Sequence, residues 1–90
     1  MERRIGFVGI ILESRNGVEM VNHVLSGHAE LILARVGLPR RDKGVSVITL
    51  VVEASTDELG TLTGRLGKIS GVSVKSALSK LGKTGVPTLT

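Results

Sequence analysis

The short stretch Glu13-Ser14-Arg15-Asn16-Gly17 combines an acid, a base, an amide and a glycine between two apolar runs. Free backbone N–H groups at the start of a helix attract anions, so a helix beginning here would offer a carboxylate site. Arg15 adds a permanent positive charge, and Glu13 could receive an amine. We therefore predict a ligand site at Arg15, Asn16 and Gly17 for an amino-acid-like molecule. The alternative is a plain turn, in which Asn16 caps the helix and Gly17 lets the chain bend.

A second charged group, Arg40-Arg41-Asp42-Lys43, precedes Gly44 and is typical of a polar hairpin connection. A solvated loop is its simplest interpretation. The alternative is an anion or nucleic-acid contact through Arg40, Arg41 and Lys43, because 12 basic and 8 acidic residues give a net charge of +4. Phe7 is the only aromatic residue, which removes the stacking surfaces that single-stranded nucleic acids need. No known DNA-binding motif fits the sequence.

Catalytic and metal-binding residue patterns are missing from the sequence. The chain has no cysteine, and His23 and His28 are five residues apart instead of the three or four that share a helical face. Asp57 and Glu58 are explained by helix capping, and no serine lies in a nucleophile elbow. We therefore expect no enzyme, no metal site and no bound cofactor.

Hydrophobic periodicity predicts four strands and two helices in the order β-α-β-β-α-β. Asn16 with Glu19, and Ser55 with Glu58, each have the spacing of a capping box at a helix start. Leu59, like the apolar residues that follow it at helical spacing, should face the core. The strands are expected at residues 4–13, 31–38, 45–54 and 72–78, with helices between 16 and 28 and between 55 and 71.

Short connections and right-handed crossovers favour a ferredoxin-like βαββαβ fold of the α+β class. Its four-stranded antiparallel sheet would have the first and third strands at its centre and both helices on one face. Both of those strands are apolar on both alternations, so the uncovered face should be buried against another copy in a dimer or tetramer. For this interface we select Val8, Ile10, Leu50 and Val52. Residues 1–80 form a single domain in this scheme, and residues 81–90 form a flexible tail.

Three glycines, Gly60, Gly64 and Gly67, lie within the second predicted helix. Each costs roughly 0.8–1.0 kcal/mol relative to Ala in a helix interior. They fall within one sector of the helix, away from its apolar stripe. We predict that this strip contacts a subunit or partner, with a ligand contact or tolerated variation as alternatives.

The βαββαβ order with Arg15 and Gly17 in the first strand-to-helix loop resembles an ACT domain, a small regulatory module that binds amino acids at subunit interfaces. Asn16 stands where that family typically has proline. The fold also resembles the regulatory domain of the nickel-responsive repressor. Because that site uses cysteine, which is missing here, nickel binding does not transfer.

A longer resemblance rests on "RIGFVGIILESR" and on "ARVGLPRRDKGVSVITLVVEASTDELGTLTGRLGKISGVSVKSALSK". These runs are similar to the ACT-like iron-only hydrogenase system regulator family of anaerobic bacteria. The resemblance implies a ferredoxin-like regulatory domain that oligomerises. We expect it to sense a small ligand at a subunit interface and, since no DNA-binding motif is present, to affect transcription through a partner protein or a basic surface that contacts phosphates. No apolar run reaches the ~18 residues of a membrane span, and we expect a cytoplasmic protein.

Overall fold

The computed structural model describes residues 2–13 and 15–80, apart from the side chain of Arg41. The expected tail, 81–90, lies outside these residues. Two short 3₁₀ turns accompany the four strands and two helices. In chain order the elements are β1 (Arg4–Leu12), α1 (Gly17–Ser26), η1 (Ala29–Leu31), β2 (Ile32–Arg40), η2 (Arg41–Lys43), β3 (Val45–Ala54), α2 (Thr56–Gly67) and β4 (Val72–Leu78).

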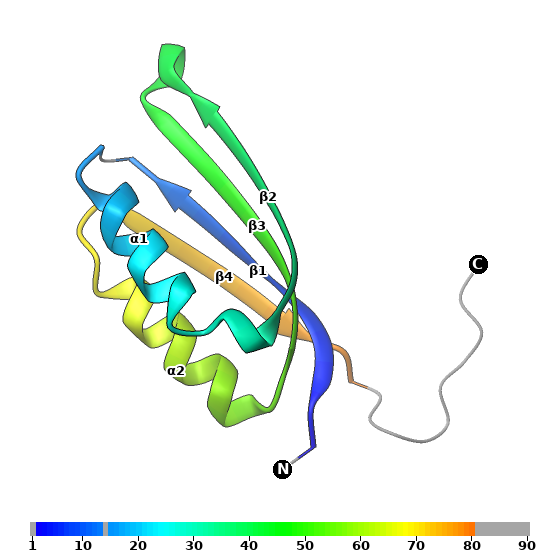
Figure 1. The fold of residues 1–90 in the computed structure, drawn as a ribbon. Coiled ribbons are helices and arrows are strands. Elements are labelled where there is room, and N and C mark those ends of the chain that lie inside the picture. The colour runs from blue at the N-terminus through cyan, green and yellow to red at the C-terminus, as the bar shows by residue number, and fades with distance from the viewer. Residues whose placement is uncertain (1, 14, 81–90) are drawn as a thin grey trace, which may run out of the picture.

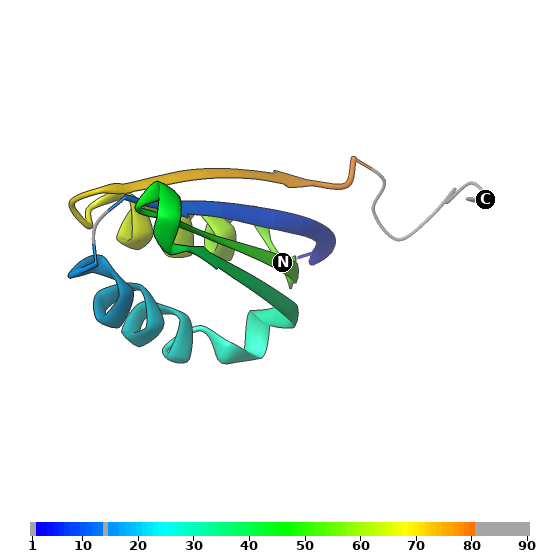
Figure 2. The same ribbon diagram turned by 90° about the horizontal axis from the view of Figure 1, so that it is seen from above.

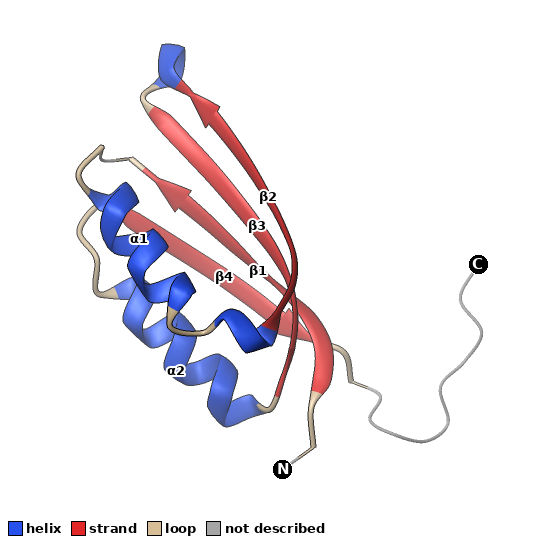
Figure 3. Cartoon of the chain, viewed as in Figure 1, coloured by secondary structure: helices blue, strands red, loops and turns tan. Residues whose placement is uncertain are grey.

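All three strand pairings of the sheet are antiparallel, and the strand order is β2-β3-β1-β4. Figure 1 and Figure 3 show the two helices running roughly along the strands, and Figure 2 shows both on the same side of the sheet. The ferredoxin-like βαββαβ prediction is confirmed, with β1 and β3 at the centre.

The core lies between the sheet and the helices and is entirely aliphatic. Leu62 and Leu66 of α2 are fully buried, as the helical spacing predicted. From the sheet, the inward alternation of β1 and β3 contributes Val8, Ile10, Leu50 and Val52, each with 0% exposure. The prediction that these four side chains form the uncovered face is therefore wrong, because they lie beneath the chain's own helices.

The opposite alternation forms the uncovered face instead. Phe7 is 49% exposed there and pairs across the sheet with Val51, which is 40% exposed. Both faces of β1 and β3 are apolar, so hydrophobicity alone did not distinguish them. The polar Thr49 and Glu53 share the alternation of Val51 and were the signal for the wetter side.

The two helix starts differ from each other. At α2 the predicted capping box is present: Ser55 Oγ accepts from the Glu58 backbone N–H at 3.1 Å, and Glu58 Oε1 accepts from the Ser55 N–H at 2.9 Å. Asn16 occupies the N-cap position of α1, but its side chain makes no capping hydrogen bond. Its backbone is already helical (φ −69°, ψ −21°), which differs from the extended conformation of a capping residue, so the predicted box with Glu19 is wrong.

The hairpin of β2 and β3 is longer than predicted because β2 continues through Pro39 to Arg40. Proline has no backbone N–H to donate to a neighbouring strand. It is tolerated here because β2 is an edge strand with a neighbour on one side only. Gly44 closes the turn with φ +68°, a conformation that favours glycine. The hairpin end extends beyond the helices (Figure 1), where it faces the start of α1.

Candidate functional site

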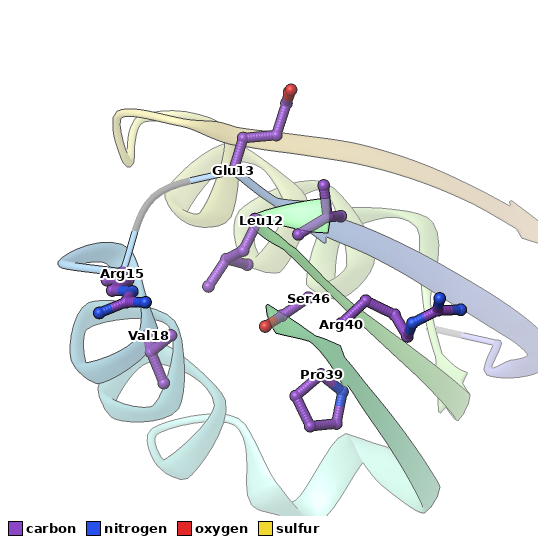
Figure 4. A pocket seen from close by; sticks show the side chains of 9 residues that line it. Leu12, Glu13, Arg15, Val18, Pro39, Arg40 and Ser46 are labelled. Atoms are coloured by element: carbon purple, nitrogen blue, oxygen red, sulfur yellow. The ribbon is translucent and has the colours of Figure 1, made fainter. Parts of the chain in front are cut away.

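An open hollow of about 670 Å³ lies between the β1–α1 loop and the β2–β3 hairpin. Apolar side chains make much of its wall, and Arg15 stands at its rim (Figure 4). Two segments that the sequence suggested as separate sites, around Arg15 and around Arg40, therefore border one hollow. The apolar part of the lining consists of Leu12, Val18, Pro39 and Val45.

Arg15 is exposed, and its guanidinium makes no ion pair with a carboxylate among residues 2–13 and 15–80. Its backbone carbonyl accepts from the Val18 N–H at 3.4 Å, which fixes the loop where it enters α1. The cation is therefore held beside the apolar wall without an internal counter-ion. An arginine in this position can bind a carboxylate or another planar anion through two hydrogen bonds.

The other two predicted ligand residues do not line this hollow. Gly17 is buried, and a Cβ built on it would lie 3.5 Å from Ile69 Cγ2 and 3.8 Å from Val72 Cγ2. These are ordinary contact distances, and they show that α1 begins close to the start of β4. Asn16 is exposed beside Arg15 but is not among the lining residues. Their roles in ligand binding stay predictions.

Glu13 borders the hollow but extends to the side opposite Leu12 (Figure 4). Successive residues of an extended chain point to opposite faces, so the buried Leu12 directs Glu13 outward. The suggested contact of Glu13 with an amine is therefore not favoured within a single chain. The hollow therefore offers the cations of Arg15 and Arg40 and an apolar wall.

The basic hairpin tip is partly neutralised by its own acid. Arg40 donates from Nε and Nη2 to Asp42 at 3.1 and 2.9 Å, a bidentate pair. This hydrogen bonding lowers the pKa of Asp42 and raises the pKa of Arg40. Among the described side chains of the tip, Lys43 has no carboxylate partner. The nucleic-acid alternative stays a prediction, and the pairing of Arg40 leaves less positive charge to support it.

The uncovered sheet face continues onto the hairpin. Cross-strand pairing puts Ile11, Val47 and Leu38 in one row and Phe7, Val51 and Ala34 in another. Large apolar side chains of this face that are at least 40% exposed are Ile5, Phe7, Ile11, Val36, Leu38 and Val51. Large contiguous apolar surfaces are uncommon on monomers, and burial of this face against another copy stays a prediction. Sequence reasoning expected this surface but assigned it to the wrong alternation.

The glycines of α2 point away from the core. A Cβ added at Gly60, Gly64 or Gly67 would meet nothing within 4 Å. They are exposed as the helical spacing predicted, and their contact with a subunit stays a prediction. His23 is exposed and His28 half-buried. The described part of the chain has no group of three or more potential metal-ligating side chains and no helix long and apolar enough to cross a membrane.

Comparisons with known proteins agree with the fold. The family model described as "TM1266-like: Iron-only hydrogenase system regulator, putative" matches residues 4–76. The solved structure of the TM1266 protein from Thermotoga maritima is 38% identical, with a TM-score of 0.83, over 88% of this chain and 100% of that one. The comparison with curated proteins found no match.

Two further solved structures share the architecture. The ACT domain from GTP pyrophosphokinase of Chlorobium tepidum is 26% identical over 83% of this chain and 99% of its own, with a TM-score of 0.72. A formyltetrahydrofolate deformylase from Pseudomonas putida has a TM-score of 0.61 at 15% identity, over 83% of this chain but only 29% of its own. This second likeness concerns the fold alone. The predicted ACT-like fold is confirmed.

Proposed function

Since the chain belongs to the TM1266-like family of iron-only hydrogenase system regulators, we propose that it is a non-catalytic regulatory module that assembles with itself and binds a small anionic effector. The hollow beside Arg15 is the proposed effector site. The likeness of the whole chain to an ACT domain supports a regulatory role. Any influence on hydrogenase production would pass through a partner protein, and the proposed location is the cytoplasm.

The unpaired Arg15 beside an apolar hollow is the observation that carries this proposal. An effector with a carboxylate would pair with the guanidinium, while an apolar side chain would lie against Leu12, Val18 and Pro39. Free amino acids with aliphatic side chains have both features. Because Glu13 points away, the ammonium group would find its partner on a neighbouring subunit or in water.

The uncovered sheet face is the proposed surface for assembly into a dimer or tetramer. Two copies meeting through this face would remove Phe7, Val51 and their neighbours from water. The same hairpin places Leu38 on this face and Pro39 in the wall of the hollow. Assembly would thus hold the hairpin in place and shape the effector site, which couples the two functions.

Isothermal titration calorimetry of the wild-type protein against the free amino acids and small carboxylates tests the effector role. We expect binding by at least one aliphatic amino acid, and an affinity at least about tenfold weaker for Arg15→Ala, since a charge-assisted hydrogen bond contributes about 1.5–3 kcal/mol. Lys68→Ala is the control because it removes a cation outside the hollow. Absence of heat with every compound would overturn the effector role, and equal binding by Arg15→Ala would overturn this site.

A further inference from the structure

A groove runs between α1 and α2 on the side of the molecule opposite the uncovered sheet face. It consists of two adjoining hollows of about 500 and 550 Å³, which share His23, Val24, Arg65 and Lys68. Along α1 and its C-cap residue it extends from Glu19 to Gly27. At 1.5 Å per residue this is about 12 Å, the length of roughly two helical turns.

The rim of the groove is basic and lacks counter-ions. Neither Arg65 nor Lys68 pairs with a carboxylate within residues 2–13 and 15–80. Arg65 Nη1 instead lies 3.4 Å from His28 Nε2, a ring nitrogen. Exposed His23 stands on the α1 side, and Glu19 is the acidic residue among the lining side chains. The groove therefore presents a positive surface with most of its charge available.

Apolar side chains form the floor between these charges. Met20 is 57% exposed, Val24 is half-buried, and Ile69 closes the bottom of the groove. A flexible thioether beside a cationic rim is typical of surfaces that receive an amphipathic segment. Exposure of Met20 is unexplained by packing within the chain, because the core beneath α1 is filled by Val21 and Leu25.

We infer that this groove docks an acidic amphipathic helix of a partner protein. The apolar side of that helix would cover Met20 and Val24, and its carboxylates would meet Arg65 and Lys68. Two turns of helix fit the groove, which brings two or three anchoring residues into contact. The inference concerns partner recognition and does not depend on an effector.

Charge argues against the other occupants. A second copy meeting groove to groove would bring Arg65 and Lys68 against themselves, and like charges repel. The chain's own residues 81–90 contain Lys83 and no Asp or Glu. A nucleic-acid backbone would gain nothing from the apolar floor at Met20 and Val24, which the apolar side of a helix would cover.

Fluorescence anisotropy with a labelled synthetic peptide tests the inference on the full chain. The probe is an acidic amphipathic peptide of about 14 residues, roughly four turns, with Leu and Glu at helical spacing. A peptide of the same composition in scrambled order and a DNA duplex are the comparisons. We expect the amphipathic peptide to bind most tightly. The double variant Arg65→Glu with Lys68→Glu should weaken its binding about tenfold, because each reversed pair exchanges an attraction for a repulsion.

The matched control is Lys43→Glu with Lys80→Glu, which changes the net charge equally at exposed positions outside the groove. It should bind the amphipathic peptide within about twofold of wild type once nonspecific charge effects are included. Circular dichroism checks that both double variants are folded. Equal weakening by both double variants, equal binding of the scrambled peptide, stronger binding of DNA, or no binding of any probe would each overturn the inference.

Discussion

At the scale of single residues, Glu58 connects three parts of the chain. Its carboxylate accepts from Arg3 Nε at 3.0 Å and Nη2 at 2.7 Å, and also from the Ser55 backbone N–H. The N-terminal segment is thereby tied to the start of α2. The hydrogen bond from Arg3 is the main reason why the pKa of Glu58 falls from 4.5 to about 2, and the bond from Ser55 adds to it.

This depressed pKa predicts how stability depends on pH. The unfolded chain takes up the proton on Glu58 near pH 4.5, whereas the folded chain does so near pH 2. The contribution of the ionised carboxylate is therefore full above about pH 5 and is lost as the pH falls toward 2. Glu58→Gln should lower the Tm at pH 7, and the difference from wild type should shrink as the pH falls. Thermal unfolding followed by circular dichroism between pH 2 and 7 measures it.

Asp57→Asn provides the control for this experiment. It removes a charge from the same first turn of α2 but leaves the Arg3–Glu58 pair in place. The Tm difference between Asp57→Asn and wild type should therefore change less between pH 2 and 5 than the Tm difference between Glu58→Gln and wild type. If the Tm difference between Glu58→Gln and wild type were the same at every pH, the depressed pKa of Glu58 would be contradicted.

At the scale of elements, β1 contains two glycines whose surroundings differ. A Cβ on Gly6 would collide with the Ala77 carbonyl oxygen and lie 2.9 Å from Leu78 Cα, both backbone atoms of β4. At Gly9 the nearest atom is the Lys75 carbonyl oxygen at 3.8 Å, an ordinary contact. Close approach of β1 and β4 thus requires glycine at position 6 and not at position 9.

Gly6→Ala should destabilise the fold by about 1–3 kcal/mol, because backbone atoms of β4 would have to move. Gly9→Ala in the same strand is the matched control, and it should be neutral or slightly stabilising, because alanine restricts the unfolded chain more than glycine does. Urea unfolding of both variants gives the two free energies. Equal values for the two variants would show that β4 adapts to the added methyl group without cost.

The elements could be predicted from the sequence more fully than the site. Strand β3 (Val45–Ala54) and strand β4 (Val72–Leu78) have the predicted bounds, because glycines and capping residues delimit them. The N-cap at Asn16 lacked its predicted side-chain bond, since the backbone there is already helical. The end of β2 was missed because Pro39 is compatible both with an edge strand and with a strand end.

The hollow could not be predicted as one site because its residues are far apart in sequence. Arg15 follows β1, whereas Pro39 and Val45 belong to the hairpin, and only the long reach of β2 and β3 brings them together. The ion pair of Arg40 with Asp42 could also be identified only from the three-dimensional structure. Which face of the sheet points away from the helices could be predicted only from the polar residues Thr49 and Glu53, because both faces are otherwise apolar.

At the scale of the whole molecule, the two layers leave opposite surfaces with different chemistry. The helix layer carries the basic groove, while the outer sheet face is apolar across three strands. A chain of 90 residues buries a small core, so a second apolar interface would add substantially to its stability. With this separation, the proposed assembly through the sheet face would leave the helices available for the proposed partner.

Val51→Lys and Phe7→Lys should each convert the proposed oligomer to a monomer. The two positions face each other in adjacent strands at the centre of the outer face, so a lysine at either one would place an unpaired charge inside the interface. Sedimentation velocity at micromolar concentrations measures the change. Met20→Lys is the control because Met20 is also an exposed apolar residue but lies on the helix layer, and it should leave the oligomer intact. A wild-type protein that sediments as a monomer would refute assembly through this face, and loss of assembly in Met20→Lys would place the interface on the helices.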